Sequence, residues 1–169
     1  MPKFISLYVK FVDFICEKVG KFVMYWVFFM MFLLILSFVT RNIINIPLMW
    51  IIEMAQFTIT AYYLLGGGYS MLTDDHVRMD LFYGKLTKKG KAKMDIFTSI
   101  FLIFFLAVLF FGSITSLIYT IETKQKLFTA WAPYVWPIKS LMLLGILLML
   151  LQAFSTLFKD IAQLQDKKI

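Results

Sequence analysis

The sequence predicts an all-α integral membrane protein with four transmembrane helices, both ends in the cytoplasm, and an amphipathic N-terminal helix at the interface. Of the 169 residues, 61% are hydrophobic, whereas soluble globular domains contain roughly 45–50% apolar residues. The excess lies in long runs with almost no charge, and about 20 apolar residues suffice for a helix to cross a bilayer. We therefore expect spans at about 22–41, 48–72, 96–120 and 136–158.

Helices are expected rather than barrel strands because the runs are continuously apolar. A spanning backbone must satisfy its own hydrogen bonds, and barrel strands would alternate apolar with polar residues. The first run is too long for the apolar part of a signal peptide, and no small-residue cleavage site follows it. We expect residues 1–169 to form a single four-helix membrane domain in which sequential helices are antiparallel neighbours.

The distribution of Lys and Arg predicts the orientation. With the N-terminus inside, four of the 17 basic residues face outward and the other 13 face the cytoplasm. An excess of Lys and Arg in short loops marks the cytoplasmic side of a membrane protein. The four outward residues are Arg41, Lys124, Lys126 and Lys139.

Residues 3–19 precede the first span and contain several charged residues. Their apolar residues recur at helical spacing, while charged residues occupy much of the other side. This pattern is typical of an amphipathic helix that lies in the membrane interface. Two interpretations remain open: the helix is a simple orientation anchor, or it is an arm that packs on a partner subunit.

Two charged residues, Glu53 and Lys139, fall inside the apolar runs near the outer ends of their helices. A carboxylate in a span is costly unless it has a partner or a wet cavity. We therefore expect Glu53 and Lys139 to approach each other, directly or through water. The functional alternative is a proton or cation carrier site at Glu53. Sites of alternating access lie near the midplane, and Glu53 is too shallow for one.

Three consecutive glycines, Gly66, Gly67 and Gly68, occur in the second span. Small residues let membrane helices approach closely, so close packing is preferred here over a hinge or a substrate path. The expected contact is a group of small residues on the third span. This group comprises Gly112, Ser113 and Ser116.

Few residues could support catalysis or bind a metal. His76, Arg78 and Asp80 follow the second span, but His76 is the only histidine and Cys16 the only cysteine. A zinc site or a bis-histidine haem therefore lacks ligands. We expect no metal, no cofactor and no catalysis, with Arg78 and Asp80 pairing or capping a helix end. Gln152 in the fourth span is expected to form an interhelical hydrogen bond.

Residues 67–83, with their His-Val-Arg-x-Asp core, resemble the segment after the second helix in a known family. This family is the small membrane subunit, of the DctQ type, of tripartite ATP-independent periplasmic (TRAP) transporters. Trp50 with Glu53, and the run Trp-Pro-Ile-Lys-Ser at 136–140, also fit the resemblance. It extends from about residue 50 to residue 152.

The resemblance implies a function that composition does not reveal. TRAP systems of bacteria and archaea import organic acids and similar solutes across the cytoplasmic membrane, using an ion gradient and no ATP. A periplasmic binding protein delivers the substrate, and a large membrane subunit carries it by an elevator-like motion. The small subunit would be a scaffold beside the large one, embedded in lipid and without nucleic acid.

The resemblance also suggests roles for individual residues. One set would hold the helices together or attach them to the large subunit. This set comprises Glu53, His76, Arg78, Asp80, Lys139 and Gln152. Arg41, Lys124 and Lys126 are candidates for contact with an acidic patch on the binding protein, with ordinary loop solvation as the alternative.

Two other functions remain open at this stage. The chain is an autonomous small exporter that uses Glu53 as its membrane carboxylate, or it is a membrane enzyme that uses His76 and Asp80. Transport or substrate conversion by the chain alone would distinguish these functions from a scaffold.

Overall fold

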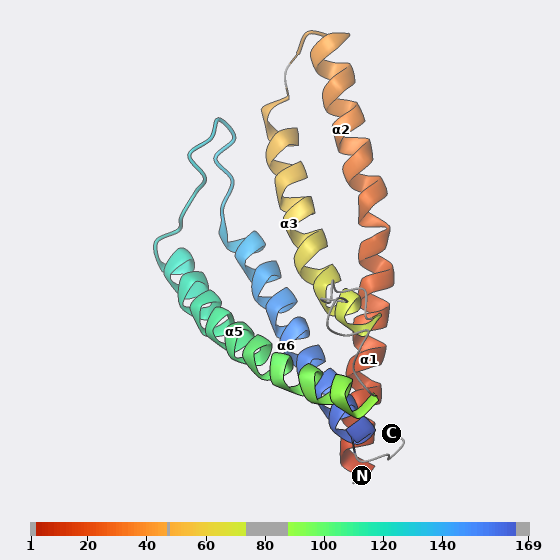
Figure 1. Ribbon diagram of the computed structural model, residues 1–169. Helices are drawn as coiled ribbons and strands as arrows, with labels where there is room; N and C mark the ends of the chain where they lie inside the picture. Colours follow the sequence, from red (N-terminus) through yellow and green to blue (C-terminus); the bar gives the residue numbers. More distant parts are fainter. Residues whose placement is uncertain (1–2, 47, 74–87, 165–169) are drawn as a thin grey trace.

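The computed structural model describes residues 3–46, 48–73 and 88–164, and these are helical apart from their connecting loops. Figure 1 shows the helices with their labels. They are α1 (Lys3–Met24), α2 (Trp26–Asn42), α3 (Met49–Leu72), α5 (Lys88–Glu122) and α6 (Trp136–Leu164). The residues expected to carry the His-Val-Arg-x-Asp core, including His76, Arg78 and Asp80, lie outside the described part.

The first two helices form one long rod. Only Tyr25 separates α1 from α2, and its backbone is itself helical, with φ −72° and ψ −17°. Figure 1 shows the two helices end to end. The rod from Phe4 to Asn42 has 39 residues, about 58 Å at 1.5 Å per residue. Residues 3–19 are thus the first part of a continuous rod that exceeds the roughly 30 Å of a bilayer core.

Three described helices are long and apolar enough to cross a membrane: Phe4–Asn42, Lys93–Glu122 and Trp136–Leu164. The remaining expected span, the second, at about 48–72, corresponds to α3, which has 24 residues and thus the length for one crossing. Its glycines, tyrosines and Glu53 make it less apolar than the other three. This composition suits its position, because α3 packs against α1, α2 and α6.

The helices form an open layer and not a closed bundle. Figure 1 shows α5, α6, α3 and α2 in that order across the molecule. The most extensive contacts are between α5 and α6 and between α3 and α6. The expectation that sequential helices are neighbours is therefore wrong for α3 and α5, whose contact is marginal. Met71 of α3 and Leu106 of α5 belong to one apolar cluster with Ala153 of α6.

The apolar core lies where α1 meets α3 and α6. Val9, Val12, Cys16 and Val23 of α1 are almost fully buried. On the outward sides, large apolar side chains such as Phe29 of α2 and many of those of α5 are exposed. An apolar exterior of this extent is unusual for a soluble monomer and matches a lipid environment. The loop between α5 and α6 is a short hairpin, in which Lys126 and Tyr134 form an isolated bridge.

Candidate functional site: polar contacts between the helices

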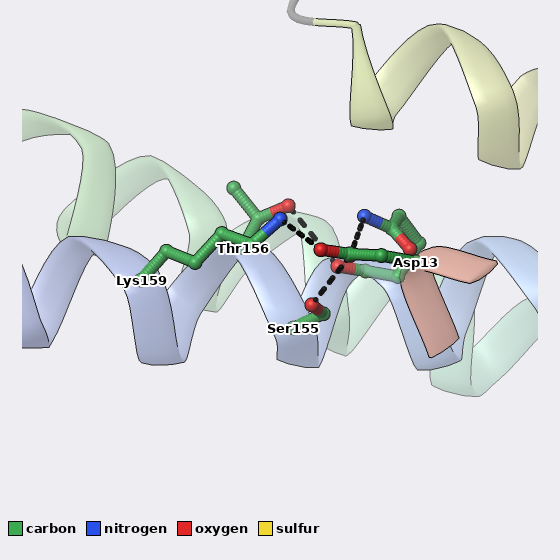
Figure 2. Close-up of polar contacts among 5 residues, drawn as sticks. Asp13, Ser155, Thr156 and Lys159 are labelled. Atoms are coloured by element: carbon green, nitrogen blue, oxygen red, sulfur yellow. Dashed lines mark hydrogen bonds and ion pairs between the residues drawn. The ribbon is translucent and has the colours of Figure 1, made fainter. Parts of the chain in front are cut away.

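A polar cluster fastens α1 to α6. Asp13 Oδ1 accepts hydrogen bonds from Gln152 Nε2 at 3.0 Å and from Ser155 Oγ at 3.1 Å, and its Oδ2 pairs with Lys159 Nζ at 2.7 Å. Figure 2 shows these contacts converging on Asp13, with Thr156 donating to the backbone oxygen of Gln152. We call Asp13, Gln152, Ser155 and Lys159 the Asp13 cluster. Gln152 and Ser155 are completely buried, so the cluster belongs to the helix interface.

The spacing of the α6 residues explains why they meet one carboxylate. Positions 152, 155 and 159 are separated by three and four residues, which places them on one face of a helix. The interhelical hydrogen bond expected at Gln152 is present, and its acceptor is Asp13. Ser155 and Lys159 were not expected to take part in this contact, although their spacing from Gln152 is a usable signal.

Glycines allow the helices of the core to approach closely. A Cβ atom built on Gly67 would lie 2.8 Å from Met149 Sδ, and one on Gly68 would lie 3.4 Å from Cys16 Sγ. The expected close packing is thus present at Gly67 and Gly68, where it is directed at α6 and α1, but not at Gly66, where a Cβ would meet nothing within 4 Å. The expected partner group on α5 is wrong, because a Cβ on Gly112 would meet nothing within 4 Å. The helix α3 also runs through the glycines without a break.

Two further close crossings were not expected from the sequence. A Cβ on Gly20 would overlap the ring of Tyr69, where α1 crosses α3. A Cβ on Gly145 would lie 2.9 Å from backbone atoms of Leu64, where α6 crosses α3. Isolated glycines in apolar helices are a signal for such crossings, but they do not identify the neighbouring helix.

The expected direct ion pair between Glu53 and Lys139 is absent. Lys139 Nζ donates instead to Ser116 Oγ at 2.9 Å and to Thr120 Oγ1 at 2.5 Å, both on α5. Glu53 is only 5% exposed, and its Oε2 has no hydrogen-bond partner. The reason is the order of the helices in the layer (Figure 1). Lys139 belongs to α6 and reaches α5 on one side of it, whereas Glu53 belongs to α3, on the other side of α6 (Figure 1).

Replacing Glu53 with glutamine is expected to stabilise the purified chain in detergent by about 1 kcal/mol. A buried carboxyl without a partner is costly, and a neutral amide is less so. The measurement is the thermal unfolding of the wild type and the variant. Glu122→Gln, at an exposed carboxylate, is the control and should change little. A loss of stability in Glu53→Gln would instead show that Glu53 has a partner.

The remaining candidates lie at the end of the molecule with the hairpin. Arg41 is exposed in the last turn of α2, and Lys124 is exposed with a left-handed φ of 46°. Lys126 Nζ lies 4.9 Å from the ring centroid of Tyr134. Within residues 3–46, 48–73 and 88–164, no group of three or more His, Cys, Asp or Glu could hold a metal ion.

The apolar helices and their buried interhelical polar contacts define a multi-pass membrane protein. A family model described as "Tripartite ATP-independent periplasmic transporters, DctQ component" matches residues 30–163. The chain therefore belongs to the DctQ family, the small membrane subunits of TRAP transporters, which confirms the resemblance seen in the sequence. This is a family of transporter components and not of enzymes. Comparison with curated proteins gives no match.

Proposed function

We propose that the chain is the scaffold subunit of a TRAP transporter in the cytoplasmic membrane of a bacterium or archaeon. It would support a large elevator-type subunit that imports organic acids or similar solutes with an ion gradient. A periplasmic binding protein would deliver the solute. The family match supports the transporter class, and the scaffold role rests on the polar contacts of the helices.

The scaffold role is supported by the direction of the buried polar groups, which bond to neighbouring helices of the same chain. The Asp13 cluster joins α1 to α6, and Lys139 joins α6 to α5. Such contacts hold helices in fixed positions, whereas a carrier presents polar groups to a cavity near the midplane. Glu53 Oε2 is buried without a hydrogen-bond partner among the described residues, but Glu53 lies within the first turns of α3, near one end of its helix.

The proposed topology has four spans, with α3 as the second, and both ends in the cytoplasm. The cation distribution supports it. The beginning of α1 and the end of α6 also lie at the same end of the molecule (Figure 1), as an even number of spans requires. In this topology the charged first half of α1 lies at the inner interface, and its exposed lysines favour anionic headgroups.

The test is purification of the affinity-tagged full chain from membranes that contain the native transporter. The large subunit should co-purify, and proteoliposomes with both subunits and the binding protein should take up solute. Proteoliposomes with the small chain alone should show no flux of solute, sodium or protons. Flux through the small chain alone would overturn the scaffold role and favour the exporter that uses Glu53.

We further propose that Arg41, Lys124 and Lys126 contact the binding protein. Replacing Arg41 and Lys124 together with glutamate should lower uptake roughly three- to tenfold when the binding protein is below saturation, because charge complementarity mainly raises association rates. The measurement is initial uptake against binding-protein concentration at low salt. Lys18→Glu, an exposed change in the first half of the rod and about 34 Å along it from Arg41, is the control. Equal uptake by the double variant and the wild type would exclude this contact.

A further inference from the structure

One glycine of α5 has no packing role within the chain. Gly20, Gly67, Gly68 and Gly145 each have an atom of another helix where a Cβ would stand, whereas the positions at Gly66 and Gly112 are open, and of these two only Gly112 is exposed on the surface. A glycine inside a helix costs about 1 kcal/mol relative to alanine. Close approach by a second helix is the usual reason for small residues in membrane helices. The open side of Gly112 therefore points to a helix from outside this chain.

The second observation concerns the contact between Ser116 and Lys139, one turn further along the same face. Ser116, four residues after Gly112, accepts a hydrogen bond from the Lys139 ammonium. All the hydrogen-bond partners of this ammonium are neutral oxygens, on Ser116 and Thr120. Among the residues that the structure describes, no carboxylate forms an ion pair with it within 4.0 Å. A cation near the hydrocarbon region is costly unless an anion accompanies it, so an outside partner with a negative group would fit here.

We propose that the face formed by Gly112, Ser116 and Lys139 packs against a transmembrane helix of the large TRAP subunit, and that this helix places a carboxylate beside Lys139. The inference rests on the proposed function, and it adds the docking face and the chemistry of its partner. Gly112 admits the backbone of that helix, and Lys139 sets its register along the membrane normal.

Other occupants of this face are distinguished by the experiments below. A phospholipid phosphate would pair with Lys139, but acyl chains do not require a gap at Gly112. A second copy of this chain would offer its exposed Glu122, which lies two residues beyond Thr120, about 3 Å along the helix. Its Glu53 is buried within its own subunit.

Photo-crosslinking in native membranes tests the face directly. A benzoylphenylalanine at Val108, one turn before Gly112 and 56% exposed, should give a crosslinked product that contains the large subunit. The control position is Ile118, which is 51% exposed and about 120° around the helix axis from Gly112. It should give lipid adducts only. A product with a second copy, equal products from both positions, or lipid adducts alone from Val108 would each overturn the inference.

Variants give an independent measurement in the same membranes. Gly112→Leu and Lys139→Gln should each lower recovery of the large subunit with the tagged chain at least tenfold, whereas Ile118→Trp should not. The glutamine in Lys139→Gln still reaches hydroxyl groups, so this variant tests the charge, and Lys139→Arg should restore recovery. Normal recovery with Gly112→Leu would overturn the inference and leave the scaffold role intact. Failure of the wild-type chain to recover any large subunit would instead contradict the proposed function.

Discussion

Alanine at Gly145 is expected to lower the free energy of unfolding of the purified chain by about 1–3 kcal/mol, as overpacking does. The new Cβ would lie 2.9 Å from the backbone carbon and oxygen of Leu64. A backbone cannot rotate away as the end of a side chain can, so α6 must move outward along its contact with α3. That contact is among the most extensive between the described helices, and the movement would loosen the centre of the layer.

The matched control for Gly145→Ala is Gly66→Ala, also inside a helix. A Cβ at Gly66 would meet nothing within 4 Å, so the gain in helix propensity should leave stability unchanged or raise it by up to about 1 kcal/mol. Gly67→Ala should fall between the two, because its nearest neighbour is the flexible end of Met149. Unfolding in detergent with increasing SDS measures all three. Equal stability of Gly145→Ala and Gly66→Ala would show that α3 and α6 do not cross closely.

The sequence predicted the helices well because length and apolar content determine a membrane span almost alone. The expected span 96–120 lies within α5, and 136–158 lies within α6. The helix 3–19 was expected to be separate because it is charged. The structure instead continues it into α2, since nothing at Tyr25 breaks a helix: it is neither proline nor glycine, and its φ and ψ are helical.

The neighbours of each helix were harder to predict. Sequence gives the depth of a residue along its helix, and Glu53 and Lys139 were paired because both are shallow. The layer order decides which helix lies opposite, and it brings Lys139 to Ser116 of α5 instead. The same limit affected Gly112, which was matched to the glycines of α3 although α5 and α3 scarcely touch. Gln152 was easier, because a buried amide needs some partner whichever helix supplies it.

Asp13 shows why a charged residue outside the spans was missed. It belongs to the polar side of an amphipathic segment, where a charged side chain is usually solvated. In the structure it is turned toward α6, and its side chain is 25% exposed. Its two buried hydrogen-bond partners, Gln152 and Ser155, distinguish it from Glu17, which pairs on the surface with Lys21 at 2.6 Å. The two acidic residues of α1 thus look alike in sequence and differ in role.

Replacing Asp13 with alanine is expected to detach α1 from α6 and to destabilise the chain by about 2–4 kcal/mol. Most of this loss comes from the Gln152 and Ser155 donors, because each buried group left without a partner costs roughly 1–3 kcal/mol. Lys159 is 38% exposed, so its ion pair adds less than about 1 kcal/mol. Asp13→Asn keeps one acceptor oxygen and should lose less than Asp13→Ala.

The single cysteine of the chain reports on this detachment. Cys16 is 2% exposed and lies one turn from Asp13 in α1, so its thiol should react with a maleimide only when α1 separates from the core. We expect Asp13→Ala to increase the labelling rate at least tenfold in detergent. Glu17→Ala removes only a surface pair on the same helix and should leave the rate unchanged. Slow labelling in both variants would mean that Val9, Val12 and Cys16 hold α1 in place by apolar packing alone, without the Asp13 cluster.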